Sequence, residues 1–207
     1  MYGTPVTPAA IAQRSSVMGR LHCMSLNNED RETLRRLARR SIALGFDRRS
    51  PAALEIVDLP PQLLEPRASF VTLTQHGRLR GCRGTLEALR PMAQDVWENA
   101  WASAFDDPRF APLPAAELAD LELEISLLSP TEPMNVVDEA DLLRQLRPGI
   151  DGLVLAHGAR RATFLPEVWK ALPEPRQFVA ELKRKAGWPQ DFWSPALRCE
   201  RYTAECF

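Results

Sequence analysis

Several features that would assign this 207-residue chain to a familiar class are scarce or missing. The four cysteines, at positions 23, 82, 199 and 206, form no C-x-x-C pair, and the three histidines are scattered. The sequence therefore contains no zinc-binding pattern, predicts no metal ligands and leaves any cofactor unknown. It also lacks a secretory hydrophobic segment, so we expect reduced thiols in a cytoplasmic protein.

Long apolar runs and a strong charge of either sign are absent as well. No run approaches the roughly 18–20 apolar residues that a membrane span requires, so no membrane association is predicted. The formal net charge is −1, which excludes a uniformly basic surface for nucleic-acid binding. There is no internal repeat or low-complexity tract, and the length suits one domain or a domain with an added lobe.

The first 26 residues contain no acidic side chain, and Arg14 and Arg20 are their only charged residues. This composition weakly resembles a transit peptide, but an extended or misassigned start before Met24 explains it more simply. We therefore expect a disordered or extended tail over residues 1–27 and a domain over 28–207. The adjacent His22 and Cys23 have no further ligands nearby in the sequence and are not predicted to bind a metal.

The remainder of the chain alternates between helical and strand patterns. Asn28 is expected to cap the first helix and Gly45 to end it. His76-Gly77 and Gly158-Ala159 are expected to turn two hairpins. Adjacent hairpins with interspersed helices indicate an α+β protein with a mostly antiparallel sheet. The predicted helices cover 28–44, 91–105, 138–146 and 175–186, and the predicted strands cover 68–75, 78–85, 121–128, 152–157, 160–165 and 197–207.

The first predicted helix carries a cluster of arginines, namely Arg35, Arg36, Arg39 and Arg40. Such a face is compatible with RNA binding. It is equally typical of a solvated helix face whose positive charges suit the carboxyl end of the helix dipole. We favour the solvated face and do not predict nucleic-acid binding.

One run, Leu79-Arg-Gly-Cys-Arg-Gly-Thr85, concentrates residues that suit chemistry. Cationic neighbours favour the thiolate form of a cysteine, and glycines let a backbone approach a ligand closely. The alternative is that the glycines mark a bulge at the end of a strand and Cys82 is a small buried hydrophobe. Strand alternation places Arg80 and Cys82 on one face and Arg83 on the other, so Arg80 is the expected neighbour of the thiol.

Other polar residues are possible partners of this thiol. Glu124 and Ser126 share the polar face of the strand predicted over 121–128. If that strand lies beside the Cys82 strand, Glu124 is placed to act as a general base and Ser126 as a donor; otherwise both belong to an ordinary solvent-facing surface. Arg109 is expected to tie a carboxylate to a carbonyl, and His157 is expected to be exposed at a turn rather than to act in acid–base chemistry.

Five motifs occur in a fixed order and resemble those of the AMMECR-type domain, the protein A component of the AmmeMemoRadiSam system. The resemblance extends from about Asn28 to the C-terminus. It implies an α+β fold with a larger lobe, in which helices flank a sheet, a smaller lobe, and a cleft near the cysteine motif. The five segments are Leu79–Thr85, Ala104–Leu113, Leu123–Pro130, Ala162–Trp169 and Arg184–Trp188.

The resemblance also implies site residues, since most positions of the motifs match those of the family. Arg83 departs from the pattern, because an apolar residue is usual at that position. Together with the residue chemistry, the match predicts Cys82 and Glu124 as catalytic residues. The predicted ligand-binding residues are Arg80, Gly81, Gly84, Thr85, Arg109 and Ser126.

Three functional hypotheses follow. In the first, Cys82 is the nucleophile of an enzyme, or a ligand to a metal or radical-derived species, while Arg80 binds an anionic or carbonyl group and Glu124 assists proton transfer. In the second, the chain is a non-catalytic partner of a Memo-like protein and a radical SAM protein, and the motif shapes a docking groove or binds a small anionic ligand. The third is RNA binding or modification, which would depend steeply on salt.

Overall fold

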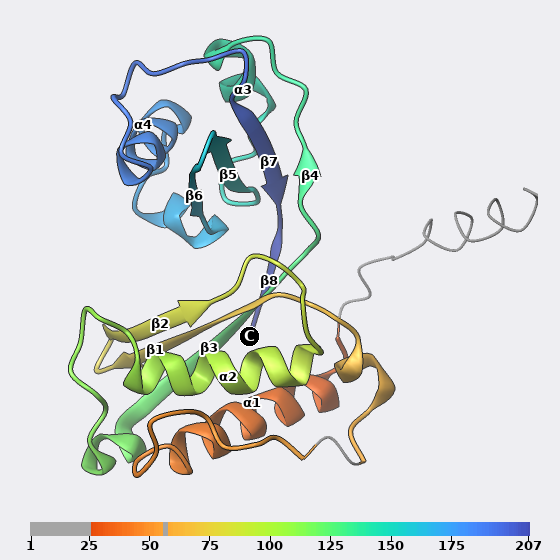
Figure 1. The fold of residues 1–207 in the computed structure, drawn as a ribbon, viewed down its shortest axis with the longest axis vertical. Helices are drawn as coiled ribbons and strands as arrows, with labels where there is room; N and C mark the ends of the chain where they lie inside the picture. The colour runs from red at the N-terminus through yellow and green to blue at the C-terminus, as the bar shows by residue number, and fades with distance from the viewer. Residues whose placement is uncertain (1–25, 56–57) are drawn as a thin grey trace, which may run out of the picture.

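The structure, a computed structural model, describes residues 26–55 and 58–207 and has the predicted α+β class. Its strands form two four-stranded sheets with the orders β2-β1-β3-β8 and β4-β7-β5-β6, and all of the pairings are antiparallel. Each sheet forms a lobe with its own helices (Figure 1), which confirms the expected two-lobed arrangement. The predicted N-terminal tail, including His22 and Cys23, lies almost wholly outside the described residues.

The observed elements agree with the predicted ones to within a few residues. The α-helices are α1 (Asn28–Ala43), α2 (Met92–Phe105), α3 (Glu139–Gln145) and α4 (Pro175–Lys185), and the 3₁₀ helices are η2 (Pro61–Leu64), η3 (Ala115–Asp120) and η4 (Pro166–Lys170). The strands are β1 (Ser69–Gln75), β2 (Arg78–Gly84), β3 (Leu121–Leu128), β4 (Glu132–Pro133), β5 (Gly152–His157), β6 (Arg160–Phe164), β7 (Arg198–Tyr202) and β8 (Ala204–Cys206).

Two boundaries differ from the prediction for identifiable reasons. Asn27, rather than Asn28, caps α1, because the Asn27 side chain accepts a hydrogen bond of 2.8 Å from the Asp30 backbone N–H. The strand predicted over 197–207 is divided into β7 and β8, which belong to different sheets. The division arises because the chain passes from one lobe to the other at Thr203.

The first lobe buries one face of its sheet against α1 and α2 (Figure 1). Val71 and Leu73 of β1 are fully buried on that face, as the alternation of the strand predicts. The two helices also contact each other, and Ser41 Oγ of α1 donates a hydrogen bond of 2.7 Å to the Trp97 carbonyl of α2. The opposite face of the sheet is left to meet the second lobe.

A tight turn joins β1 to β2 at His76-Gly77, as predicted. Both residues have positive φ, 51° and 71°, which is the requirement of the two-residue turn that follows the twist of a hairpin. The hairpin is nevertheless irregular. Its register shifts between Leu73 and Thr74, which face Gly81 and Leu79, so that Arg80 is an extra residue in a bulge.

The second lobe has a separate core between its sheet, α3, α4 and η4. Trp169 stacks on Phe178 with ring centroids 3.8 Å apart and an interplanar angle of 2°. Lys183 is fully buried, and its Nζ donates to Glu139 at 2.7 Å and to the Gln190 carbonyl at 3.0 Å. A buried charge needs such partners, and they fix α4 against α3.

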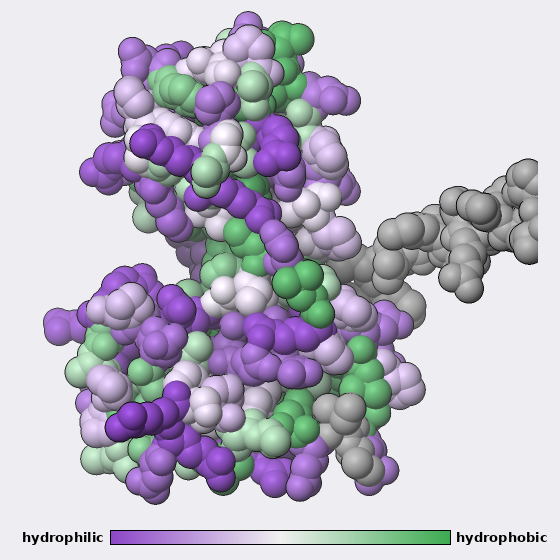
Figure 2. All heavy atoms as spheres, viewed as in Figure 1, coloured by the Kyte–Doolittle hydropathy of each residue, from purple (hydrophilic) through white to green (hydrophobic). Residues whose placement is uncertain are grey.

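The lobes are connected by two antiparallel segments, one from β3 to β4 and the other from β7 to β8 (Figure 1). Ser129 N donates to the Thr203 carbonyl at 2.9 Å, and Thr203 N donates back to Ser129 Oγ at 3.0 Å. A small apolar cluster that includes Leu128 and Tyr202 fills the junction. On the face shown in Figure 2 the waist between the lobes is narrow and carries apolar and weakly polar residues.

The arginine cluster of α1 is partly engaged by the protein itself. Arg35 pairs with Glu32 and lies 5.3 Å from the centroid of the Phe207 ring. Arg39 donates to the Leu121 carbonyl at 3.4 Å. The expectation that this face does not bind nucleic acid stays a prediction. No helix within 26–55 or 58–207 combines the length and apolar character needed to cross a bilayer.

Candidate functional site

The face of the first sheet that lies away from α1 and α2 carries both predicted catalytic residues, Cys82 and Glu124. Cys82, Thr72 and Glu124 stand in one row across β2, β1 and β3. The row confirms that Cys82 and Glu124 share a face. However, β1 lies between their strands, so their Cα atoms are about 10 Å apart. The side chain next to Cys82 is Thr72, whose Oγ1 donates to Sγ at 3.3 Å.

Glu124 interacts with the second lobe rather than with Cys82. Burial raises the pKa of Glu124, the charge of Glu167 and a hydrogen bond to it raise it further, and Lys170 opposes the shift. Glu124, Glu167 and Cys206 line a cavity of about 430 Å³ beneath η4. The expected role of Glu124 as general base for Cys82 therefore has no supporting contact.

Ser126 occupies the next row of the same face, with Phe70 and Cys206 as cross-strand neighbours. Its hydroxyl lies 3.4 Å from Cys206 Sγ and is buried. Ser126 is therefore placed at the β8 end of the sheet, away from the Cys82 thiol. Its predicted part in ligand binding stays a prediction.

The backbone of Cys82 is held by the segment that follows α2. β2 is an edge strand, and the Cys82 N–H, which points away from β1, donates to Asp107 Oδ2 at 2.9 Å. Arg109 Nη2 donates to the Cys82 carbonyl at 3.2 Å, and Arg109 also bonds Asp107 through Nε at 2.9 Å and Nη2 at 2.7 Å. We call this arrangement the Asp107–Arg109 clamp. It confirms the expected tie by Arg109 between a carboxylate and a carbonyl.

The clamp has an electrostatic consequence for its own carboxylate. Asp107 is buried, which by itself would favour the protonated form. The hydrogen bond from Arg109, supported by the backbone N–H groups of Cys82 and Arg109, overcomes this and holds the pKa of Asp107 well below its usual range. The clamp therefore carries its charges at any ordinary pH.

The two glycines beside Cys82 are required by packing. A Cβ on Gly81 would lie 2.0 Å from the Ser103 carbonyl of α2, and a Cβ on Gly84 would lie 2.2 Å from the Phe70 ring. Neither glycine has positive φ. The Ser103 hydroxyl bridges β2 and β1, because it accepts a hydrogen bond from Arg83 N at 2.8 Å and donates one to the Val71 carbonyl at 2.7 Å. In this structure the glycines accommodate a helix and a ring, and their predicted approach to a ligand stays a prediction.

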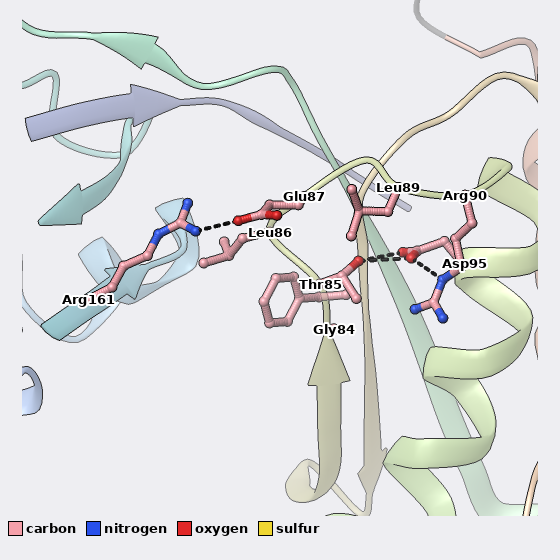
Figure 3. Close-up of a pocket in the computed structure, with 9 residues that line it drawn as sticks. Gly84, Thr85, Leu86, Glu87, Leu89, Arg90, Asp95 and Arg161 are labelled. Carbon is pink, nitrogen blue, oxygen red and sulfur yellow. Dashed lines mark hydrogen bonds and ion pairs between the residues drawn. The ribbon is translucent and has the colours of Figure 1, made fainter. Parts of the chain in front are cut away.

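Thr85 belongs to a buried network around Asp95. Its hydroxyl lies 2.8 Å and 2.9 Å from the two carboxylate oxygens. Asp95 also accepts from Ser69 N at 2.8 Å and from Asn99 Nδ2 at 2.8 Å. Figure 3 shows the contacts of Asp95 with Thr85 and with Arg90, whose Nε donates to Asp95 at 2.9 Å. Sequence analysis did not single out Asp95, the centre of this network.

A second cavity, of about 570 Å³, lies where β2 leaves the sheet, and both Gly84 and Thr85 line it. Arg161 of β6 reaches Glu87 across this space with a 2.8 Å ion pair that connects the two lobes (Figure 3). Leu89, also in its lining, is 83% exposed. The cavity is thus an open space between the lobes that begins two residues beyond Cys82.

Arg80 does not lie beside the thiol as strand alternation predicted. Its Nε donates to Glu117 at 2.8 Å, and its Nη1 donates to the Ala111 carbonyl at 2.9 Å. The bulge at this residue takes Arg80 out of the alternation on which the prediction rested. Its guanidinium secures the segment before β3 instead.

Cys82 raises the pKa of two other cations. One is Arg109 of the clamp, whose pKa is raised first by Asp107 and also by Cys82. The other is Lys185 of α4, whose Nζ donates to the Thr163 carbonyl at 3.0 Å. Desolvation and the Arg109 charge lower the pKa of Lys185, whereas Cys82 raises it. Sequence reasoning used Lys185 only as part of a family motif and missed this proximity, because it depends on how the lobes meet.

The remaining described thiols differ from Cys82. Cys199 is buried, and its burial raises its pKa to about 11. Cys206 is exposed, but partial desolvation of its thiol and the nearby charges of Glu124 and Glu167 raise its pKa. His157 lies against Phe192, with ring centroids 5.3 Å apart, so it packs rather than stands free at the turn. Within residues 26–55 and 58–207, no three His, Cys, Asp or Glu side chains are placed to share a metal ion.

The geometry thus combines a half-exposed thiol on an edge strand, a hydroxyl donor at Thr72 and the guanidinium of Arg109. Such an arrangement suits a nucleophile that meets an anionic molecule. Among residues 26–55 and 58–207, no carboxylate or imidazole forms a hydrogen bond with the sulfur.

Comparisons with known proteins agree with this architecture. The AMMECR1 family model matches residues 35–207. A protein of Methanothermobacter thermautotrophicus is 36% identical over 189 residues, covering 88% of this chain and 95% of that protein. A Thermococcus gammatolerans protein is 34% identical and covers 88% and 91%. The crystal structure of an uncharacterised protein from Pyrococcus horikoshii superimposes with a TM-score of 0.81 at 33% identity, over 87% of this chain and 92% of that one. The chain therefore belongs to the AMMECR1 family.

Proposed function

We propose that the protein is a thiol-dependent enzyme whose reacting atom is Cys82 Sγ, at the face between the two lobes. One observation carries the proposal. The Asp107–Arg109 clamp holds both main-chain polar groups of Cys82, while the side chain is only half-buried. A nucleophile gains from being held in one position.

The residues around the sulfur have different proposed roles. Thr72 donates a hydrogen bond to Sγ, which fixes its direction. Arg109, which bonds the Cys82 carbonyl, is placed to bind an anionic part of the substrate. In the proposed step, the sulfur electron pair forms a bond to an electrophilic carbon of the substrate, and the electrons displaced there move to the substrate's oxygen or to its leaving group. Glu124 is assigned no part in this step.

The family resemblance supports a wider setting for the proposal. It implies that the chain acts as the protein A component of the AmmeMemoRadiSam system, together with a Memo-like protein and a radical SAM protein. The unpaired cysteines favour the cytoplasm as the place of action. Those proteins would then supply or consume the molecule that reacts at Cys82.

The proposal is tested by replacing the chromosomal gene with two matched variants. Cys82→Ser is expected to reproduce the phenotype of the gene deletion, because the hydroxyl is a poor nucleophile at neutral pH. Cys206 is an exposed cysteine and serves as the control. The Cys206→Ser strain is expected to behave as the wild type. A Cys82→Ser strain that is indistinguishable from the wild type, with the protein at normal abundance, would refute the enzymatic proposal.

The second candidate is a non-catalytic binding partner. It is favoured by the apolar surface of the open cavity, where Leu89 is 83% exposed. On this view Cys82→Ser leaves co-purification with the Memo-like and radical SAM proteins intact, and Leu89→Asp abolishes it. Arg80→Ala is not a suitable test of either view, because Arg80 supports the segment before β3.

A further inference from the structure

We propose that the cavity beneath η4 is a binding site for a small organic amine, whose protonated nitrogen would lie between the carboxylates of Glu124 and Glu167. The first lobe supplies Glu124 from β3, and the second lobe supplies Glu167 from η4. Cys82 is not among the described residues that line this cavity, and the proposed reaction gives Glu124 no part. The amine site is therefore a second site and does not depend on the proposed function.

The walls of this cavity are mostly apolar. Pro148, Pro166 and Pro173 contribute pyrrolidine rings, and Trp169 contributes part of an indole that is otherwise buried. The volume of about 430 Å³ falls within the range of about 300–1,000 Å³ that is usual for small-molecule sites, in which apolar walls surround a few polar groups. We therefore expect the body of the bound molecule to be apolar.

The polar groups of the cavity determine the charge of the ligand that it suits. The carboxylates of Glu124 and Glu167, the ammonium group of Lys170 and the thiol of Cys206 all line it. Partial desolvation and the two carboxylates raise the pKa of this thiol, so the thiol is uncharged at neutral pH. With both carboxylates ionised, the cavity carries one negative charge in excess.

Glu124 is the carboxylate that lacks a counter-ion. Lys170 pairs with Glu167, with 3.2 Å between Nζ and Oε1, and 81% of the Lys170 side chain is exposed. In the part of the chain that the structure describes, no arginine, lysine or histidine forms an ion pair with Glu124. Burial and the Glu167 charge raise the pKa of Glu124, so the protein destabilises the ionised form. An ammonium group bound between the two carboxylates would stabilise that form through charge-assisted hydrogen bonds.

An organic amine suits the cavity better than a metal ion does. Calcium and magnesium ions take about six or more oxygen ligands, whereas no three His, Cys, Asp or Glu side chains within 26–55 or 58–207 are placed to share a metal ion. An ammonium group has only three N–H donors, and two carboxylates can accept them. Its apolar body would also cover the proline rings, which a metal ion would leave in water.

Benzylamine is the probe for this site, because it joins an ammonium group to a small apolar ring, and benzyl alcohol is its neutral counterpart. Saturation-transfer NMR on the full-length protein at pH 7 measures the binding of each compound. Benzylamine is expected to bind in the millimolar range. Benzyl alcohol is expected to bind at least about tenfold more weakly, because it makes no charge-assisted hydrogen bond.

Glutamine variants test the two carboxylates separately. Glu124→Gln and Glu167→Gln each keep the shape of the side chain and remove one negative charge, so each is expected to weaken benzylamine binding about tenfold. The matched variant Glu181→Gln removes a carboxylate of α4 that pairs with Arg184 and does not line the cavity. It should bind benzylamine as the wild type does, and thermal unfolding confirms that each variant is folded.

The Cys206 thiol locates the binding, because it is exposed and lines the same cavity. Benzylamine at twice its measured Kd should slow the alkylation of Cys206 by iodoacetamide about threefold, in proportion to occupancy, and should leave Cys82 unaffected. The amine site is refuted if benzylamine does not bind, if benzyl alcohol binds equally well, if both glutamine variants bind benzylamine unchanged, or if Cys206 is not protected. None of these results would bear on the reaction proposed at Cys82.

Discussion

The Asp107–Arg109 clamp allows a quantitative prediction for the variant Asp107→Asn. The Asp107 carboxylate accepts four hydrogen bonds, one from the Cys82 N–H and three from Arg109. An asparagine of nearly the same shape keeps one acceptor oxygen, and its amide nitrogen faces N–H groups that it cannot bond. Two or more charge-assisted hydrogen bonds are therefore lost, and the Arg109 guanidinium loses its counter-ion.

Net contributions of about 1.5–3 kcal/mol are typical of a hydrogen bond to a charged group. Relaxation of the exposed Arg109 side chain will recover part of the loss. We therefore expect the free energy of unfolding of Asp107→Asn to be about 2–4 kcal/mol lower than that of the wild type. For a chain of this length, that corresponds to a fall in Tm of about 5–15 °C.

The pH dependence provides an independent check on the cause. The pKa of Asp107 is depressed in the folded protein, so its stabilising contribution is complete above the ordinary aspartate value of 3.8 and is lost only as the pH falls towards the folded value. The difference between wild type and variant should therefore be constant from pH 5 to 8 and should shrink in strong acid.

Urea denaturation and thermal unfolding, followed by circular dichroism, measure both quantities. Asp106→Asn is the matched control, because the Asp106 carboxylate is exposed and pairs only with Arg83 at 3.5 Å among the described residues. The control should lie within about 0.5 kcal/mol of the wild type. Equal stability of Asp107→Asn and Asp106→Asn at pH 7 would show that the clamp does not hold the Cys82 strand.

Three further predictions concern the surroundings of the site. Gly81→Ala places a Cβ 2.0 Å from the Ser103 carbonyl and should lower the free energy of unfolding by about 1–3 kcal/mol. Urea titration measures this loss. An unchanged free energy of unfolding would mean that α2 does not pack closely against β2. Thr85→Val removes the hydroxyl bonded to Asp95 and should cost about 1–3 kcal/mol in the same assay, while an unchanged midpoint would argue against the network. Glu124→Gln removes a carboxylate whose pKa is raised in the folded state. Because the stability of the wild type falls as Glu124 ionises, the variant should have a higher Tm than the wild type at pH 7 and an equal Tm at pH 4. A Tm difference of the same size at both pH values would contradict this assignment.

Much of the fold is predictable because its signals are local. The turn at His76-Gly77, the alternation of Val71 and Leu73, and the termination of α2 before Pro108 all follow from neighbouring residues. The start of α1 was wrong by one residue, because Asn27 and Asn28 are neighbouring residues that can both cap a helix.

The site was harder to predict because it depends on non-local order. Glu124 was placed on the correct face, but the position of β1 between β2 and β3 cannot be read from alternation. Arg80 was assigned to the wrong neighbour because the one-residue bulge shifts the strand register, so that alternation no longer predicts the sheet face of Arg80. Lys185 belongs to a helix of the other lobe, so nothing within about 100 residues of Cys82 in the sequence indicates it.

The most direct test of the account is the relative reactivity of the described thiols in the native protein. With limiting iodoacetamide at pH 7.5, we expect Cys82 to be modified first, at least about tenfold faster than Cys206 and far ahead of Cys199, whose burial raises its pKa to about 11. Modification of Cys82 that is as slow as that of Cys199, and that becomes fast only on unfolding, would contradict the account.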